Sequence, residues 1–225
     1  LEVGHPPGNP VFQLFARFFT MFFDNMHAAV AVNAMNGICS ALTIFFLYLT
    51  IVFFAKRVVK PAEDGTYSVA KAIAIFGSGA VGALAYCFSD TFWFSAVEGE
   101  VYALSSMFTA LVVWLMLRWE EEAESSHSWR WIILIAYLMG LSIGVHILNL
   151  LTIPALVFIY YFRTTKAVTW KGLLYATLIA GAILLAINGI IIPYTVLIGM
   201  HVDIWFVNSL GLPVNTGIVV FVLLM

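Results

Sequence analysis

The stretch AAVAVNAMNGICSALTIFFLYLTIVFFA, residues 28–55, holds no charged side chain and is followed at once by Lys56 and Arg57. An α-helix rises about 1.5 Å per residue, so about 20 apolar residues cross the hydrocarbon core of a bilayer. This stretch is longer than that, and it ends in cations, which stay at the aqueous surface. It therefore predicts a membrane-spanning helix whose Lys56 end faces the cytoplasm.

The composition of the whole chain agrees with this prediction. Of 225 residues, 63% are hydrophobic and 10% are charged, whereas an average soluble domain has about 25% charged residues. So few charges cannot cover a water-soluble fold, which excludes a soluble globular protein. Cys39 and Cys87 both lie in apolar runs, so neither a disulfide framework nor a thiolate metal site is predicted.

Five more apolar segments are suitable for spanning helices, and a seventh is entered near the end of the chain. They cover residues 70–88, 101–119, 130–147, 149–163 and 171–200, and the seventh begins at about 217. Gly140 and Gly144 lower the helix propensity where the fourth span meets the fifth, which predicts a tight reversal there. The predicted fold is an all-α polytopic transmembrane helical bundle with about seven spans.

The basic residues set the orientation of these spans. Of the ten lysines and arginines, all except Arg17 lie in or beside alternate connections, which by the positive-inside rule face the cytoplasm. The acidic run from Glu120 to Glu124 falls in one of these connections and is interpreted as a solvated loop. The other connections are poor in cations and are assigned to the outer side of the membrane.

A shorter amphipathic segment precedes the first span. Within it Gln13, Arg17, Thr20 and Asp24 recur at spacings of four, three and four residues, which places them on one stripe of a helix. The remaining positions are mainly Phe, Leu and Met. This pattern predicts an interfacial helix over residues 11–24, lying at the outer membrane surface.

A single transmembrane domain accounts for the whole chain. Residues 1–27 form its outer loop and interfacial helix, and residues 28–225 form the transmembrane helices. The chain does not begin with Met, and its last apolar run, GIVVFVLLM, is about half the length of a span. We therefore expect a fragment that is truncated at both ends.

Titratable side chains gather in the connections assigned to the outer side, where they mark a candidate site. These are Glu2, His5, Asp24, His27, Asp90, Glu98, Glu100, His146, His201 and Asp203. On the same side, Arg17 is the residue that carries a fixed positive charge.

Two interpretations stay open for Glu98, Glu100 and His146. Glu98 and Glu100 precede Tyr102 in SDTFWFSAVEGEVYAL, where they either cap a helix N-terminus or line a watery cavity. His146, beside Asn149, is either a structural hydrogen-bonding group or a functional one. No metal site is predicted, because two residues spaced like Glu98 and Glu100 do not share a helical face.

Four segments carry a family resemblance: LEVGHPPG, SAVEGEVYAL, GLSIGVHILNLL and FVNSLGLPVNTG, in this order. They resemble the GT-C superfamily of membrane glycosyltransferases, and within it most closely an uncharacterised bacterial family allied to the transmembrane protein O-mannosyltransferases. The resemblance covers essentially all of the chain. It implies an enzyme that moves a sugar, mannose or another hexose, from a polyprenyl-phosphate carrier to a Ser or Thr hydroxyl of an exported protein. The active site would face the periplasm at a bacterial inner membrane.

The resemblance also implies roles for single residues. The acidic base of such enzymes precedes the HPP turn, so here it would lie upstream of Leu1. The better-known O-mannosyltransferases carry an Arg for the donor phosphate near the outer end of the span after the surface helix, where this chain has Asn33. The outer-side donors available in its place are Arg17, His5 and His146. Arg17 is the first choice, because guanidinium stays charged and binds phosphate bidentately. The alternative for Arg17 is a side chain that snorkels to the lipid headgroups. The predicted substrate-binding residues are His5, Arg17, Glu98, Glu100, Tyr102, His146 and Asn149.

The donor is already activated, so no cofactor is expected, and the predicted partners are membrane lipid, the lipid-linked sugar and the protein acceptor, without nucleic acid. Two alternatives remain. A secondary transporter could use a Glu/His proton relay, although the sequence shows neither an inverted repeat nor acidic residues in the centre of the spans. The second alternative is a non-catalytic subunit of a membrane assembly. An Asp or Glu in the preceding outer loop would favour the enzyme over both.

Overall fold

The computed structural model describes residues 9–23 and 27–224, and within them the chain is helical without a β-strand. An all-α fold was predicted, and the structure confirms it. Packing divides the chain into two compact units, Leu1–Lys166 and Ala167–Met225. Each unit is described by itself.

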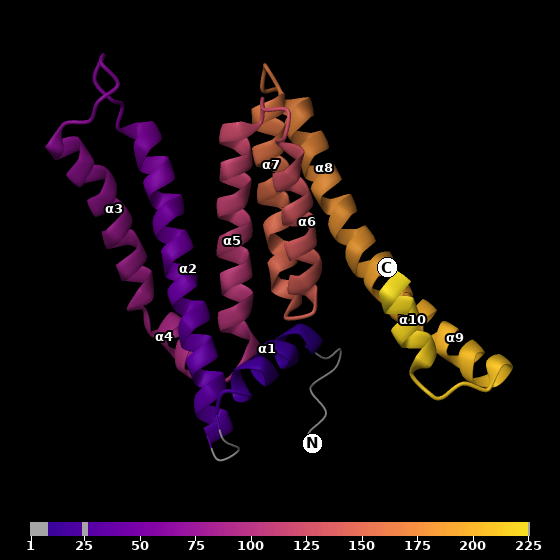
Figure 1. Cartoon of the computed structure of the whole chain (residues 1–225). Helices are drawn as coiled ribbons and strands as arrows, with labels where there is room; N and C mark the ends of the chain where they lie inside the picture. Colours follow the sequence, from indigo (N-terminus) through magenta and orange to yellow (C-terminus); the bar gives the residue numbers. More distant parts are fainter. Residues whose placement is uncertain (1–8, 24–26, 225) are drawn as a thin grey trace. The chain divides into compact units, whose positions relative to one another are not determined.

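In the first unit, long helices lie side by side and the short helix α1 crosses one end of them (Figure 1). The helices α2 and α5 pack together, α3 packs on α2, and α6 and α7 pack on α5. Their bounds are α1 Pro10–Thr20, α2 Ala28–Val58, α3 Val69–Cys87, α4 Asp90–Val97, α5 Val101–Glu122, α6 Trp129–Ile143 and α7 Ile153–Thr164. A 3₁₀ helix, Ile147–Thr152, joins α6 to α7.

Small residues bring α3 close to α2. A Cβ added to Gly79 would lie 2.6 Å from Cγ2 of Val52, and one added to Gly82 would lie 2.7 Å from Cδ1 of Ile51. Helices in a bilayer gain stability from such close backbone approach, because lipid and side chains are equally apolar and burial alone does not drive association.

The predicted interfacial helix forms as α1 and ends at Thr20, four residues before Asp24, which lies outside the described residues. One face packs into the core, while Leu14 and Phe18 on another face are exposed, as in a helix that also meets lipid. The backbone N–H of Val11 donates to the carbonyl of Gly144 at 2.9 Å. The core cluster under α1 contains Phe12, Met35, Cys39, Ala103, Leu104, Phe108 and Val145.

The structure does not confirm seven spans. Five helical stretches are long and apolar enough to cross a membrane: Ala28–Val58, Val69–Cys87, Val101–Glu122, Ile147–Thr164 and Trp170–Leu210. The span predicted over residues 130–147 is the helix Trp129–Ile143, with 15 residues, which is shorter than the roughly 20 that a span needs. The predicted reversal between the fourth and fifth spans is confirmed, since α6 ends at Ile143 and the chain turns back through Gly144.

In the second unit, α8 (Trp170–Ala186), a π-helical turn (Ile187–Ile191) and α9 (Ile192–Leu210) form one continuous stretch of 41 residues. The π turn ends two residues before Pro193, which lies in the first turn of α9. The ring of a proline does not fit a regular α-helical turn, and its nitrogen cannot donate. The prediction ended this span at residue 200 and began a connection there. Instead the helix continues to Leu210, and Gly211 ends it with a left-handed φ of 65°.

The helix α10 (Thr216–Leu224) packs against α9 through Asp203. This buried carboxylate accepts the backbone N–H groups of Asn215 at 3.1 Å, Gly217 at 2.9 Å and Ile218 at 3.3 Å. A side chain at Gly217 would collide with the backbone of Asp203. Asp203 was grouped with the candidate site residues, but its oxygens satisfy the first turn of α10, as a helix cap does.

Replacing Asp203 by Ala should lower the stability of the second unit by about 2 kcal/mol, because three backbone donors lose a charged acceptor. Thermal unfolding of the purified protein and protease cleavage within residues 211–215 would measure the change. Asp90→Ala is the matched control, since Asp90 is exposed in the first turn of α4. Equal stability of the two variants would contradict a capping role for Asp203.

Candidate functional site

The reversal between α6 and α7 carries His146, which is half-buried and in an extended backbone conformation. Its Nδ1 accepts the backbone N–H of Leu148 at 3.2 Å and caps the 3₁₀ helix. This bond assigns the proton of a neutral imidazole to Nε2. The ring also contacts the ring of Tyr102, with 5.4 Å between the two centroids. His146 therefore has a structural bond through one nitrogen and keeps the other for a different partner.

Asn149 lies fully buried behind His146. Its amide nitrogen donates to Oγ of Ser142 at 2.7 Å and to Sδ of Met139 at 3.3 Å. Its oxygen accepts the hydroxyl of Thr109 on α5 at 3.1 Å. Because these bonds join three elements and use both polar atoms, Asn149 holds the reversal against α5 and does not face a ligand itself.

Glu98 and Glu100 lie in the short connection between α4 and α5, and both are exposed. Since α5 begins at Val101, Glu98 precedes this helix, whereas Tyr102 lies in its first turn. Glu100 occupies the N-cap position of α5 but makes no capping hydrogen bond through its side chain. No side-chain hydrogen bond therefore supports the capping interpretation, and both carboxylates belong to exposed residues.

Asn36 on α2 fixes this connection, and the sequence analysis missed it. Its side chain is fully buried, and its amide nitrogen donates to the carbonyl of Glu98 and to the carbonyl of Glu100, the latter at 2.8 Å. A polar amide in the middle of an apolar span needs partners, because an unsatisfied one is costly in hydrocarbon. A polar residue within an apolar run was therefore the signal in the sequence that pointed to Asn36.

A cleft of about 420 Å³ opens between α2, α3 and α5. Seven of the side chains that line it carry hydroxyl groups, and none is charged. They are Thr43, Thr50, Tyr86, Tyr102, Ser105, Ser106 and Thr109, with the apolar Leu47, Ala110, Val113 and Leu148. Ser105 is only 4% exposed. The hydroxyl groups of this lining can hydrogen-bond an uncharged polar occupant.

Some of the predicted site residues therefore lie near one another. Tyr102 lines the cleft, His146 contacts Tyr102, and Asn149 lies behind them. Arg17 is exposed in the last turn of α1 and forms no ion pair with another described residue. The helix α1 crosses the end of the first unit where the α4–α5 connection and the α6–α7 reversal lie (Figure 1). His5 lies outside the described residues.

Comparison with known proteins identifies a family that this chain matches. Residues 1–169 match the family described as Protein O-mannosyl-transferase TMEM260 N-terminal domain. The chain belongs to this family. A Mus musculus protein named Protein O-mannosyl-transferase TMEM260 is 27% identical over 146 residues, which are 64% of this chain and 18% of that protein. A Dictyostelium discoideum protein of the same name is 24% identical over 115 residues, 50% of this chain and 12% of that protein.

The chain spans less than a fifth of the length of these curated relatives. No solved structure matches it. The region that matches the TMEM260 N-terminal domain ends three residues after the first compact unit, which ends at Lys166. The family match and the packing therefore delimit nearly the same part of the molecule, and the cleft and the residues around it lie within that part.

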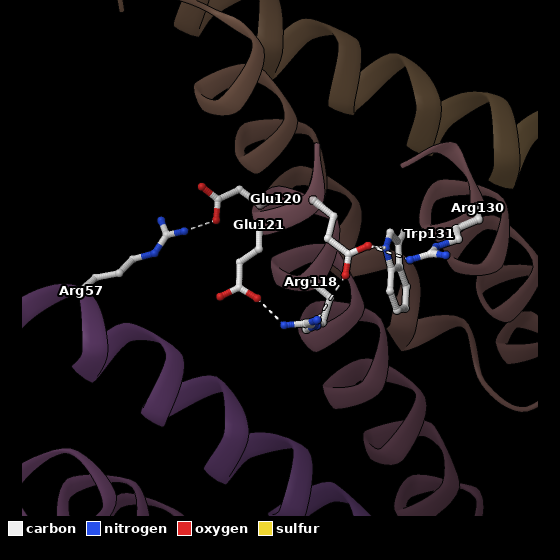
Figure 2. A network of polar contacts seen from close by, with 7 residues as sticks. Arg57, Arg118, Glu120, Glu121, Arg130 and Trp131 are labelled. Atoms are coloured by element: carbon white, nitrogen blue, oxygen red, sulfur yellow. Dashed lines mark hydrogen bonds and ion pairs between the residues drawn. The ribbon is translucent and has the colours of Figure 1, made fainter. Parts of the chain in front are cut away.

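The opposite end of this TMEM260 N-terminal domain holds an ion-pair network (Figure 2). The acidic run was predicted to be a solvated loop, but the structure corrects this, because Glu120 and Glu122 belong to the last turn of α5 and pair with arginines of neighbouring helices. Arg130 lies 2.7 Å from Glu122. The other contacts are Arg57 with Glu120, Arg118 with Glu121 and Glu122, and Trp131 Nε1 with Glu122. Among the described residues, no group of three His, Cys, Asp or Glu side chains is arranged to hold a metal ion.

Proposed function

We propose that this chain is part of a membrane glycosyltransferase that transfers a sugar to a hydroxyl group of a protein. The family match over residues 1–169 carries this proposal, because two relatives in that family bear the name Protein O-mannosyl-transferase. The hydroxyl-lined cleft supports it, since hydroxyl groups can both donate to and accept from the hydroxyls of a sugar. The donor is a polyprenyl-phosphate-linked hexose, and the acceptor is a Ser or Thr of an exported protein.

The transfer breaks the bond between the anomeric carbon and the phosphate oxygen of the donor. The acceptor oxygen forms a new bond to that carbon, the phosphate leaves with the electron pair, and a carboxylate takes the hydroxyl proton. The lipid phosphate is the activated leaving group, so the reaction needs no cofactor. In the GT-C enzymes that this chain resembles, that carboxylate precedes the HPP turn.

Negative charge develops on the departing phosphate, and Arg17 is its proposed partner. A guanidinium stays charged and binds phosphate oxygens in a bidentate manner, and Arg17 is exposed on α1 at the end where Tyr102 and His146 meet. Nε2 of His146 is the proposed donor to the sugar or phosphate.

We further propose that the α1 end faces the side of the membrane opposite the cytoplasm, which is the periplasm for a bacterial inner membrane. The basic residues Arg57, Arg118, Arg130 and Arg163 support this orientation, because they lie at the other end of the first unit. Exported proteins and lipid-linked sugars are both accessible on that outer side.

Arg17→Ala in the full-length protein should raise the KM for a polyprenyl-phosphate mannose donor at least tenfold, as expected for a lost charge-assisted phosphate contact. Transfer of radiolabelled mannose to a Ser/Thr peptide would measure it. Gln13→Ala, one turn earlier on α1 and equally exposed, is the control. An unchanged KM would remove Arg17 from the donor site. If wild-type protein gives no transfer and exported proteins keep their glycans when the gene is deleted, the transferase proposal itself is wrong.

A further inference from the structure

A second pocket, of about 620 Å³, lies at the end of the first unit that carries the arginines. The end of α5, the start of α6 and the end of α7 enclose it. Its polar and aromatic lining comprises Trp119, Glu124, Ser128, Trp129, Tyr160, Arg163, Thr164, Thr165 and Lys166. Neither the proposed transfer reaction nor the ion pairs of Figure 2 use this pocket.

Aromatic rings form one side of the pocket. Trp119 is buried and stacks on Tyr160, with ring centroids 5.2 Å apart and planes 17° apart. Trp129 is 63% exposed at the first residue of α6. Trp and Tyr rings concentrate at the headgroup level of bilayers, because one edge is polar and the other apolar. The pocket therefore opens where the headgroups of one leaflet lie.

Two cations line the pocket. Arg163 donates through Nε to the carbonyl of Glu120 at 3.0 Å and through Nη2 to Glu124 at 2.9 Å, so these bonds aim its guanidinium. The partner carboxylate of Glu124 is 88% exposed, so an anion can displace it at little cost. Lys166 is exposed and forms no ion pair within the described part of the chain. The lining thus carries one more cation than anion.

A buried hydroxyl adds a directed donor. Ser128 is 7% exposed and lines the pocket. It occupies the N-cap position of α6, but its side chain does not cap that helix. The N-terminus of a helix also attracts anions through its free N–H groups and its dipole. Ser128, Arg163 and Lys166 therefore converge on a space that suits an anion.

We infer that this pocket binds the phosphate of an anionic phospholipid from the leaflet at the arginine-rich end. A lipid is the favoured source of the phosphate, because the pocket opens beside exposed aromatic rings at the ends of membrane-spanning helices. The inference is independent of the proposed transferase activity and of the cleft between α2, α3 and α5.

The test uses the full-length protein in maltoside micelles and short-chain dioctanoyl phosphatidylglycerol as the probe, with binding followed by calorimetry. Lys166→Ala should weaken binding about fivefold, the effect of one cation at a membrane surface. Ser128→Ala should weaken it to a similar degree, and Glu124→Gln should tighten it, because the competing carboxylate is gone. All three changes spare the bond between Arg163 and Glu120 that ties α7 to α5.

Lys60→Ala is the matched control, since it removes one cation from the same end without touching the pocket. Equal weakening by Lys60→Ala and Lys166→Ala would overturn the inference in favour of unspecific charge attraction. Equal binding of dioctanoyl phosphatidylcholine would overturn the requirement for an anionic lipid. Displacement by millimolar inorganic phosphate would show that free phosphate is the ligand. Absence of any phosphatidylglycerol binding to the wild type would refute the site altogether.

Discussion

Leucine in place of Gly144 should detach α1 from the bundle and lower sugar transfer by the full-length protein more than tenfold. A Cβ at Gly144 would lie 2.5 Å from Cγ2 of Val11 and 3.4 Å from the carbonyl oxygen of Leu141, so the side chain has no room. Overpacking of this kind costs about 1–3 kcal/mol. The collision falls where the N–H of Val11 meets the carbonyl of Gly144, so the strain is relieved by moving the helix that carries Arg17.

Gly140→Leu is the control for this prediction. Gly140 precedes Gly144 by one turn of α6 and has nothing within 4 Å of an added Cβ, so the variant gains the same side chain without a clash. Transfer activity and the labelling of a cysteine placed at Gln13 would be compared between the two variants. Wild-type activity in Gly144→Leu would show that the contact between α1 and the reversal does not serve the reaction.

Asn36→Asp should lower the stability of the first unit by about 3 kcal/mol or more and leave little activity. The wild-type amide donates to two carbonyls, whereas an ionised carboxylate would bring a buried negative charge against them without a donor. The connection that holds Glu98 and Glu100 would then lose its attachment to α2. Thermal unfolding in detergent measures the stability, and the transfer assay measures the activity.

Asn33→Asp makes the same chemical change three residues earlier on α2. Asn33 is exposed, so water can solvate the new carboxylate, and the stability should change by less than about 0.5 kcal/mol. Similar losses in both variants would mean that added negative charge at this end of α2 is harmful, and the two carbonyl bonds of Asn36 would not explain the effect.

The fold was largely predictable because a membrane imposes one rule on every span. Apolar runs of sufficient length must be helical, which located α2, α3 and α5 to within a few residues. The rule fails where polar residues find partners that the sequence does not reveal. His201 and Asp203 indicated the end of a span at residue 200, but Asp203 bonds to the backbone of α10, so the helix passes through it. The predicted span also ran through Pro193 as a regular helix, whereas the structure places a π turn before it.

The site was predictable to a smaller degree. Tyr102 and His146 were both singled out, but their ring contact depends on how α5 packs against the reversal, which no local pattern encodes. The cleft did leave a signal that was overlooked. Four of its hydroxyl residues follow the spacing i, i+3, i+4 and i+7 on α5, which is one helical face. They are Tyr102, Ser105, Ser106 and Thr109.

The lining of that cleft has a consequence for how the protein responds to acidity. Serine, threonine and tyrosine hydroxyls carry no charge near neutrality, and no carboxylate, imidazole or amine lies among the residues that enclose the space. Its affinity for a neutral guest is thus insensitive to proton concentration across the physiological range. Any acid or alkaline limb of the rate profile must therefore originate in titratable groups outside this lining.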